Sequence, residues 1–105
     1  MQIKLLTLIS VLFIATFAKA AATVVLENHR KTEVVTLYID GNFGCGAVSK
    51  SYCTTLAVEG KHTLKFFSSP RGDTDEKVVT LEDGESYTWV VCDVNDKSPA
   101  CTETH

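Results

Sequence analysis

Short runs of β-branched and aromatic residues alternate with turn residues along the chain, and this alternation limits the fold more than any other feature. Residues 33–39 (EVVTLYI) form one such run, and residues 40–42 (DGN) follow it with turn chemistry. Residues 86–94 (SYTWVVCDV) form the strongest predicted strand, after a turn at residues 82–85 (EDGE). Because turn signals recur about every ten residues, we expect an all-β fold built from hairpins, either a sandwich or a small barrel.

Further strands are expected between these two runs. Residues 52–58, 62–67 and 77–81 have strand composition, and residues 62–67 (HTLKFF) alternate apolar and polar side chains. Between them, residues 59–61 (EGK) predict a tight reversal and residues 68–75 (SSPRGDTD) a hairpin turn. We therefore favour a small, disulfide-stabilised antiparallel β-sandwich.

Glycine is concentrated just after the first strong strand. Gly41, Gly44 and Gly46 fall within six consecutive residues, followed by no helical pattern. The spacing differs from the G-x-G-x-x-G arrangement that cradles phosphates at the start of a helix. This segment is therefore predicted to be a loop without a nucleotide-binding role.

The N-terminal residues have the pattern of a cleaved signal peptide. Lys4 provides a short positive region, residues 5–17 are predominantly apolar, and residues 18–20 (AKA) supply the small residues of a cleavage site. The apolar run is shorter than the roughly 20 residues that span a bilayer, so a retained anchor is the weaker interpretation. We expect cleavage after Ala20, a single domain over residues 21–105 without a transmembrane segment, and a secreted or periplasmic location.

All four cysteines belong to the expected mature domain. In an oxidising compartment they are expected to pair, and four cysteines allow three connectivities. We favour the two local pairs, each closing a loop worth roughly 2.5 kcal/mol in the chain-entropy model. Zinc is the alternative, but neither spacing is the short Cys-x-x-Cys of structural zinc sites. The predicted disulfide residues are Cys45 with Cys53 and Cys92 with Cys101; no metal or cofactor is expected.

The charge of the chain bears on its partner. The sequence has 10 basic and 13 acidic residues, and the basic Lys4 and Lys19 lie in the expected signal peptide. The mature domain is therefore acidic, with no basic cluster larger than Arg30-Lys31, and nucleic acid is not an expected partner. We expect the partner to be another protein.

No arrangement of side chains indicates catalysis. His62 lies in a predicted strand, His29 in a polar turn and His105 at the last position, and none belongs to a recognisable nucleophile–base constellation. The carboxylates of residues 82–85 crowd a single turn, which is typical of a solvated turn rather than a glycosidase pair. The sequence therefore predicts a protein that is not an enzyme.

Aromatic residues are the main candidates for a binding surface. Tyr87 and Trp89 share one face of their predicted strand, and either they form an exposed patch or, as we favour, they fill the core of a small domain. Tyr38 lies on the strand face opposite Leu37, and Phe43 lies in the predicted glycine-rich loop. Tyr38, Phe43, Tyr87 and Trp89 are therefore candidate binding residues.

The tripeptide Arg71-Gly72-Asp73 is the sequence that many adhesive proteins present to integrins. It falls between two predicted strands, after Pro70, where a hairpin turn alone accounts for the proline and glycine. Arg71 and Asp73 remain candidate binding residues, with the turn as the favoured interpretation.

Two segments resemble PEGA-type domains. Residues 37–41 (LYIDG) end a strand in an Asp-Gly turn, and residues 55–66 (TLAVEGKHTLKF) contain a Gly-x-His turn that opens a later strand. The resemblance implies a compact β-sandwich that acts as a non-catalytic surface or envelope module. It implies no catalytic residue.

Three functions remain open from the sequence. The leading hypothesis is a small exported, non-catalytic protein-binding module. The second is an inhibitor or immunity protein of an exported enzyme, inserting a disulfide-held loop at residues 43–53 led by Phe43. The third is a structural or adhesive component of the cell surface.

Overall fold

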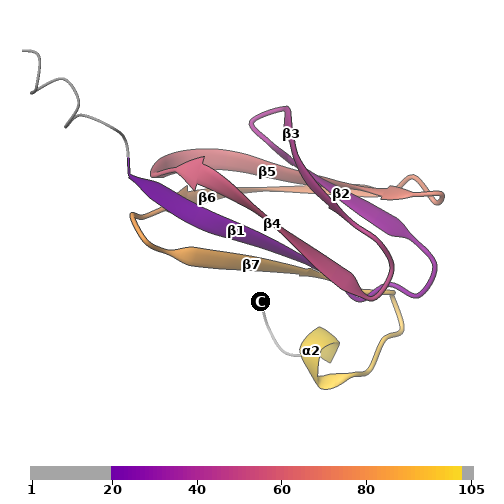
Figure 1. Ribbon diagram of the computed structural model, residues 1–105. Helices are drawn as coiled ribbons and strands as arrows, with labels where there is room; N and C mark the ends of the chain where they lie inside the picture. Colours follow the sequence, from indigo (N-terminus) through magenta and orange to yellow (C-terminus); the bar gives the residue numbers. More distant parts are fainter. Residues whose placement is uncertain (1–19, 103–105) are drawn as a thin grey trace, which may run out of the picture.

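The computed structural model describes residues 20–102, so nearly all of the predicted signal peptide, and also His105, lie outside the described residues. The described chain is almost entirely β (Figure 1). Its elements are β1 (Ala21–Asn28), β2 (Val34–Ile39), β3 (Asn42–Ala47), β4 (Ser51–Val58), β5 (Gly60–Ser69), β6 (Thr74–Leu81), β7 (Ser86–Val91) and a short helix, α2 (Pro99–Thr102).

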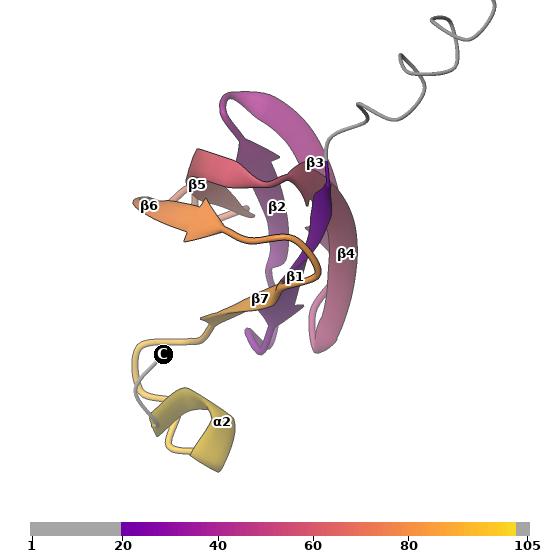
Figure 2. The ribbon, with the colours of Figure 1, turned by 90° about the vertical axis from the view of Figure 1, so that its left-hand side faces the viewer.

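The strands form two sheets that face each other. One sheet has three strands in the order β4-β1-β7, and the other has four in the order β3-β2-β5-β6. Figure 2, in which the ribbon is turned by 90°, shows the two layers. The prediction of an all-β sandwich is therefore confirmed.

The core lies between the sheets and follows the alternation of the strands. In β1, Val24 and Leu26 are fully buried, whereas Thr23, Val25 and Glu27, which alternate with them, are only partly buried. Burying each such side chain contributes roughly 1.5–3 kcal/mol relative to leaving it in water. The buried apolar residues are Ala22, Val24, Leu26, Val35, Leu37, Ala47, Leu64, Phe66, Leu81, Trp89 and Val91.

The glycine-rich segment is strand β3 rather than the predicted loop. Asp40 and Gly41 both adopt positive φ, 52° and 84°, and form the two-residue turn that joins β2 to β3. Gly44 brings the strand close to β2, because a Cβ there would lie 3.1 Å from the Leu37 carbonyl oxygen. The prediction was wrong because the glycines allow a tight turn and close strand packing, both compatible with an extended chain.

The reversal predicted at residues 59–61 is present, but it is not a hairpin. Gly60 has φ 127° at this point. The chain passes from β4, which pairs with β1, to β5, which pairs with β2 and β6. The turn therefore carries the chain from one sheet to the other.

Strand β7 departs from the expectation in two ways. It ends at Val91, earlier than the predicted residue 94, and a short helix follows. It pairs with β1 in parallel, whereas the other strand pairs are antiparallel among the described residues. This pair is the parallel exception in an otherwise antiparallel sandwich, because β7 follows a strand of the other sheet and runs in the direction of β1.

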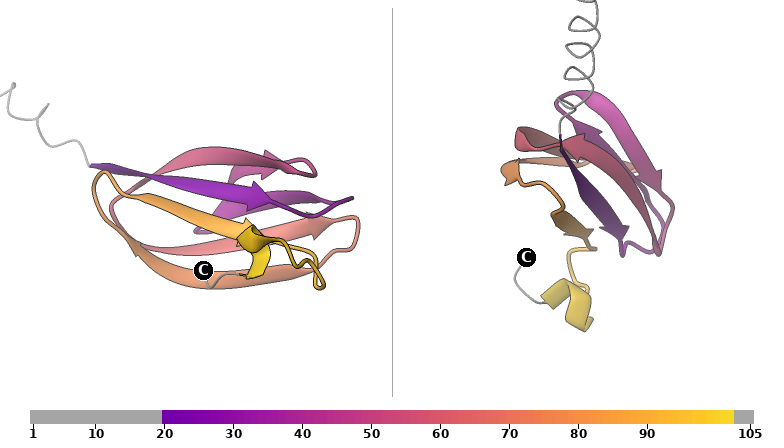
Figure 3. Two further views of the ribbon diagram at one scale, coloured as in Figure 1. Left: turned by 90° about the horizontal axis from the view of Figure 1, so that it is seen from below. Right: turned by 60° about the vertical axis from the view of Figure 1, so that its left-hand side comes forward.

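Both predicted disulfides are confirmed. Cys45 on β3 bonds to Cys53 on β4, with 6.0 Å between their Cα atoms, so this disulfide joins the two sheets along one side of the sandwich. Cys92 bonds to Cys101 with 5.9 Å between the Cα atoms and ties α2 to the end of β7. Figure 3 shows α2 beside that end of the strand.

Candidate binding surface

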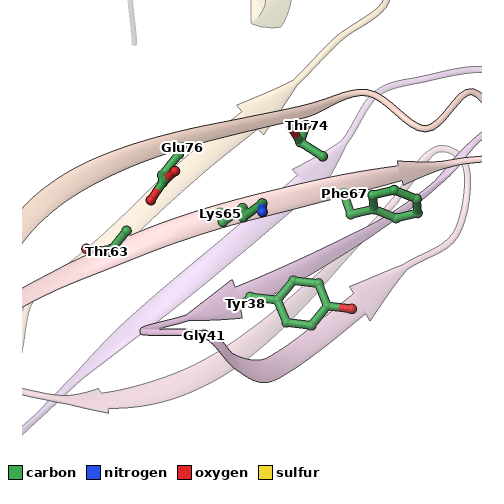
Figure 4. A pocket seen from close by; sticks show the side chains of 7 residues that line it. All are labelled: Tyr38, Gly41, Thr63, Lys65, Phe67, Thr74 and Glu76. Atoms are coloured by element: carbon green, nitrogen blue, oxygen red, sulfur yellow. The ribbon is translucent and has the colours of Figure 1, made fainter.

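The outer face of the four-stranded sheet carries a hollow that gathers aromatic, charged and hydroxyl side chains. It measures about 630 Å³, and Figure 4 shows the side chains around it. Its lining residues are Tyr38, Gly41, Thr63, Lys65, Phe67, Thr74 and Glu76. The hollow therefore combines two aromatic rings, of the kind enriched at protein interfaces, with one cation and one carboxylate.

The β2–β3 hairpin positions two aromatic rings at one side of this face. A register shift between Leu37 and Tyr38 places Tyr38 opposite Phe43. The two rings meet edge to face, with centroids 6.4 Å apart and an interplanar angle of 80°. Phe43 remains 68% exposed despite this contact. The Tyr38 ring therefore supports an exposed phenylalanine ring beside the hollow.

Strand β5 contributes the centre of the hollow. Lys65 lies between Tyr38 on β2 and Glu76 on β6 in the strand register, so the cation and the carboxylate occupy adjacent positions. Phe67, two residues further along β5, is 40% exposed. In Figure 4 the rings of Tyr38 and Phe67 are seen together with the Lys65 side chain.

A histidine–aspartate pair fixes the β2–β3 turn beside the hollow. His62 Nδ1 lies 2.6 Å from Asp40 Oδ2, and His62 Nε2 lies 2.7 Å from the Val58 carbonyl oxygen. The Thr63 amide donates to Asp40 Oδ1 at 2.9 Å. Both ring nitrogens face oxygen acceptors, an arrangement that favours the protonated imidazolium, in which both nitrogens are donors.

These contacts shift the pKa of both partners. The hydrogen bond to Asp40, followed by that to Val58, raises the pKa of His62 above its ordinary value of 6.5. The Thr63 amide, followed by His62, lowers the pKa of Asp40. Since the pKa of His62 is raised on folding, its contribution to stability is complete below pH 6.5 and is lost as the pH rises through the raised pKa.

We expect the free energy of unfolding to decrease as the pH rises above 6.5. Urea unfolding at a series of pH values measures this decrease, and an NMR titration of the His62 ring measures the pKa itself. Asp40→Asn is the matched variant, because asparagine also tolerates positive φ and preserves the turn. In that variant the His62 pKa should fall; an unchanged pKa would contradict the role given to the Asp40 carboxylate.

Tyr87 and Trp89 face the interior and do not join the hollow. Trp89 is 5% exposed and packs against Phe66 edge to face, with ring centroids 5.2 Å apart. Tyr87 is partly buried and packs against the core. Of the aromatic candidates, Tyr38 and Phe43 are therefore the two that the structure brings together on one outer face.

Arg71 and Asp73 belong to an ionic network at one end of the sandwich. Arg71 Nη2 lies 3.0 Å from Glu33 Oε2, and Asp73 Oδ1 lies 2.9 Å from Arg30 Nη1. The Ser68 amide also donates to the Asp73 carbonyl at 2.9 Å. These contacts hold the β5–β6 hairpin against the β1–β2 turn, so the tripeptide has a structural role in the fold.

Arg30 is the centre of this network. Its side chain is 7% exposed, and Nη1 donates to Glu33 Oε1 at 3.0 Å as well as to Asp73. Nε donates to the Cys92 carbonyl at 3.0 Å, and the guanidinium carbon lies 5.5 Å from the centroid of the Phe66 ring. Hydrogen bonding by Ser68, followed by Arg30, lowers the pKa of Glu33. One guanidinium therefore joins β1, β2, β6 and β7 near their ends.

Sequence reasoning did not identify Phe67, Lys65 or Glu76 as binding residues. The signal for Phe67 was available, because the alternation that buries Leu64 and Phe66 directs Lys65 and Phe67 outward. Glu76 required knowledge of the register between β5 and β6, which the sequence does not provide.

Among residues 20–102, one group of three residues of metal-ligating types converges. Cys92, Asp96 and Cys101 have ligand atoms within 4.8 Å of one another. Both sulfurs belong to the same disulfide, so they are not available as thiolate ligands.

Comparison of the chain with family models, with curated proteins and with solved structures finds no match. Within residues 20–102, no helix combines the length and apolar character that crossing a membrane requires.

Proposed function

We propose that the chain is an exported, non-catalytic protein-binding module that contacts its partner through the outer face of the β3-β2-β5-β6 sheet. The observation that carries the proposal is the exposure of Phe43 and Phe67 on one face, with Tyr38 packed against Phe43. Aromatic side chains are enriched in protein interfaces, where burying them on a partner contributes much of the affinity.

The disulfides support the exported part of the proposal. Two disulfides fit a non-cytoplasmic, oxidising compartment. We propose specifically that the chain is cleaved after Ala20 and is then secreted or located in a periplasm.

The hollow supports binding rather than catalysis. Its neighbouring histidine, His62, uses both ring nitrogens in hydrogen bonds to Asp40 and Val58. A general base requires a free ring nitrogen within reach of a substrate proton. We therefore assign His62 a positioning role in the turn that presents Phe43.

The resemblance to PEGA-type domains supports the same proposal. The two turns that carry it, at Asp40-Gly41 and at Gly60-Lys61-His62, contact each other through the His62–Asp40 hydrogen bond. In our proposal, these turns belong to a non-catalytic surface or envelope module, as the resemblance implies.

Inhibition of an exported enzyme is the second candidate function. Phe43 projects from a strand that is tied to β4 by the Cys45–Cys53 disulfide, which limits the entropy lost when the hairpin inserts into a site. The inserting element in this version is the β2–β3 hairpin instead of a loop.

We expect the double substitution Phe43→Ser with Phe67→Ser to weaken partner binding by at least about 2 kcal/mol, or roughly 30-fold, as removal of interface hot spots does. Residues 21–105, with both disulfides formed, serve as bait for secreted and envelope proteins of the organism. Quantitative mass spectrometry then compares the proteins retained by each variant.

Leu56→Ser is the matched control, because Leu56 is 70% exposed on β4, in the other sheet. Loss of one stoichiometric partner from the double variant, with retention by Leu56→Ser, supports the proposal. Equal retention by all three proteins rules out this face as the interface.

A further inference from the structure

The two sides of the sandwich are closed in different ways. On one side the edge strands β3 and β4 are joined by the Cys45–Cys53 disulfide. On the other side the edge strands β6 and β7 belong to different sheets and do not pair, as the views in Figure 3 show. An edge strand presents unpaired N–H and C=O groups that another strand can use.

The two open-side strands differ in how their edges are protected. On β6, Lys77 pairs in register with the fully buried Leu64 and shares its inward face. An inward-pointing charge is a common protection against strand addition. Strand β7 (SYTWVV) has no charge, proline or register shift, so its edge lacks these forms of protection.

The hydrogen bonds to β1 identify which amides of β7 face the open edge. The Glu85 carbonyl accepts from the Thr23 amide at 2.8 Å, and the Val91 carbonyl accepts from the His29 amide at 2.9 Å. Since backbone groups of successive residues point to opposite sides of a strand, the odd-numbered positions from 85 to 91 face β1. The N–H and C=O groups of Ser86, Thr88 and Val90 consequently point away from β1, and no other described strand pairs with them.

A cation lies at the seam beside this edge. Lys77 Nζ is 4.7 Å from the centroid of the Trp89 ring and 5.9 Å from that of Tyr87. Among the ion pairs of residues 20–102, none involves Lys77. A strand added to β7 would direct alternate side chains toward this seam, next to the ammonium group.

We propose that the open edge of β7 binds an extended segment of another protein as an additional strand, with a carboxylate of that segment facing Lys77. Main-chain hydrogen bonds would be made with Ser86, Thr88 and Val90, and the carboxylate would complement the unpaired ammonium group. This edge is separate from the hollow on the outer face of the other sheet, so either interaction can fail without the other.

A second copy of the chain fits this edge less well. If β7 paired with β7 of another copy, Tyr87 and Trp89 of each would meet across the pair, each already covered by its own Lys77. Two ammonium groups would then approach the same seam, and like charges in adjacent cross-strand positions are destabilising.

The test uses amide hydrogen exchange of residues 21–105 with a synthetic probe. The probe is a capped six-residue peptide of alternating threonine and valine, matched to the length of β7, with one valine replaced by glutamate. We expect exchange at Ser86, Thr88 and Val90 to slow by roughly tenfold at saturation, because these amides gain partners. The same peptide with alternate backbone nitrogens methylated should leave exchange unchanged, because it cannot form the ladder.

The charge of Lys77 allows a second, independent test of the proposal. A peptide with lysine in place of glutamate, or the variant Lys77→Gln, should weaken binding about threefold, as loss of a partly exposed ion pair does. Lys65→Gln, on the outer face of the other sheet, is the matched control and should bind normally. Unchanged exchange at the three amides overturns the proposal, as does equal binding of the methylated peptide. If the three amides exchange more slowly at higher protein concentration without peptide, and dimers form, the proposal is overturned and a second copy of the chain is the occupant of the edge.

Discussion

Replacing Arg30 with leucine is expected to lower the free energy of unfolding by about 3–5 kcal/mol, as breaking a buried ion pair by removing one partner does. The guanidinium contacts Glu33, Asp73 and the Cys92 carbonyl, so its removal affects the ends of several strands at once. Urea unfolding followed by the fluorescence of Trp89, the single tryptophan, measures the loss.

Arg71→Leu is the control for this prediction. The Arg71 side chain is 49% exposed and forms one ion pair, with Glu33. A half-exposed ion pair contributes about 0–1 kcal/mol, so the free energy of unfolding should change little. Equal destabilisation by the two substitutions would contradict the assignment of Arg30 as the centre of the network.

Removing the Cys45–Cys53 disulfide by a double serine substitution should lower the free energy of unfolding by about 2.5 kcal/mol, from the entropy regained by the unfolded chain. This disulfide joins β3 to β4 and therefore closes one side of the sandwich. Thermal and urea unfolding of the oxidised wild type and the variant provide the measurement.

The double serine substitution of Cys92 and Cys101 is the matched comparison, with a sequence separation of 9 against 8 for the other pair. It releases the segment that carries α2, which lies after the last strand, so the core can remain folded. We expect a smaller change in the unfolding transition. A larger change than for Cys45–Cys53 would show that the C-terminal segment, rather than the sheet-to-sheet link, is the greater source of stability.

The sequence predicted the fold well where strand periodicity and turn chemistry agree. Residues 33–39 and 52–58 became β2 and β4 within one residue at each end, because alternating apolar side chains need one buried face. The pairing of the cysteines was also predictable, since each pair closes a short loop.

Other parts of the fold depend on contacts between distant residues. Glycine in residues 41–46 indicated a loop locally, but pairing with β2 and the disulfide to β4 hold this segment extended. The parallel pairing of β7 with β1 is likewise set by the path of the chain between sheets, which local composition does not encode.

The candidate site was predictable in part. Tyr38 and Phe43 were chosen for their aromatic character, and their contact depends on a turn of two positive-φ residues and a register shift. Arg71 and Asp73 were candidate binding residues within a predicted turn, and their ion-pair partners lie elsewhere in the sequence: Asp73 pairs with Arg30, 43 residues away, and Arg71 pairs with Glu33. Long-range ion pairs of this kind leave no local signal.

The most direct test of the proposed binding face is site-specific photo-crosslinking. A photoreactive phenylalanine analogue is placed at Phe43 in one protein and at Leu56, on the other sheet, in a second. Each is then irradiated in the exported protein fraction. The proposed function predicts one discrete protein adduct at position 43 and none at position 56. No adduct at position 43, or the same adducts at both positions, would contradict it.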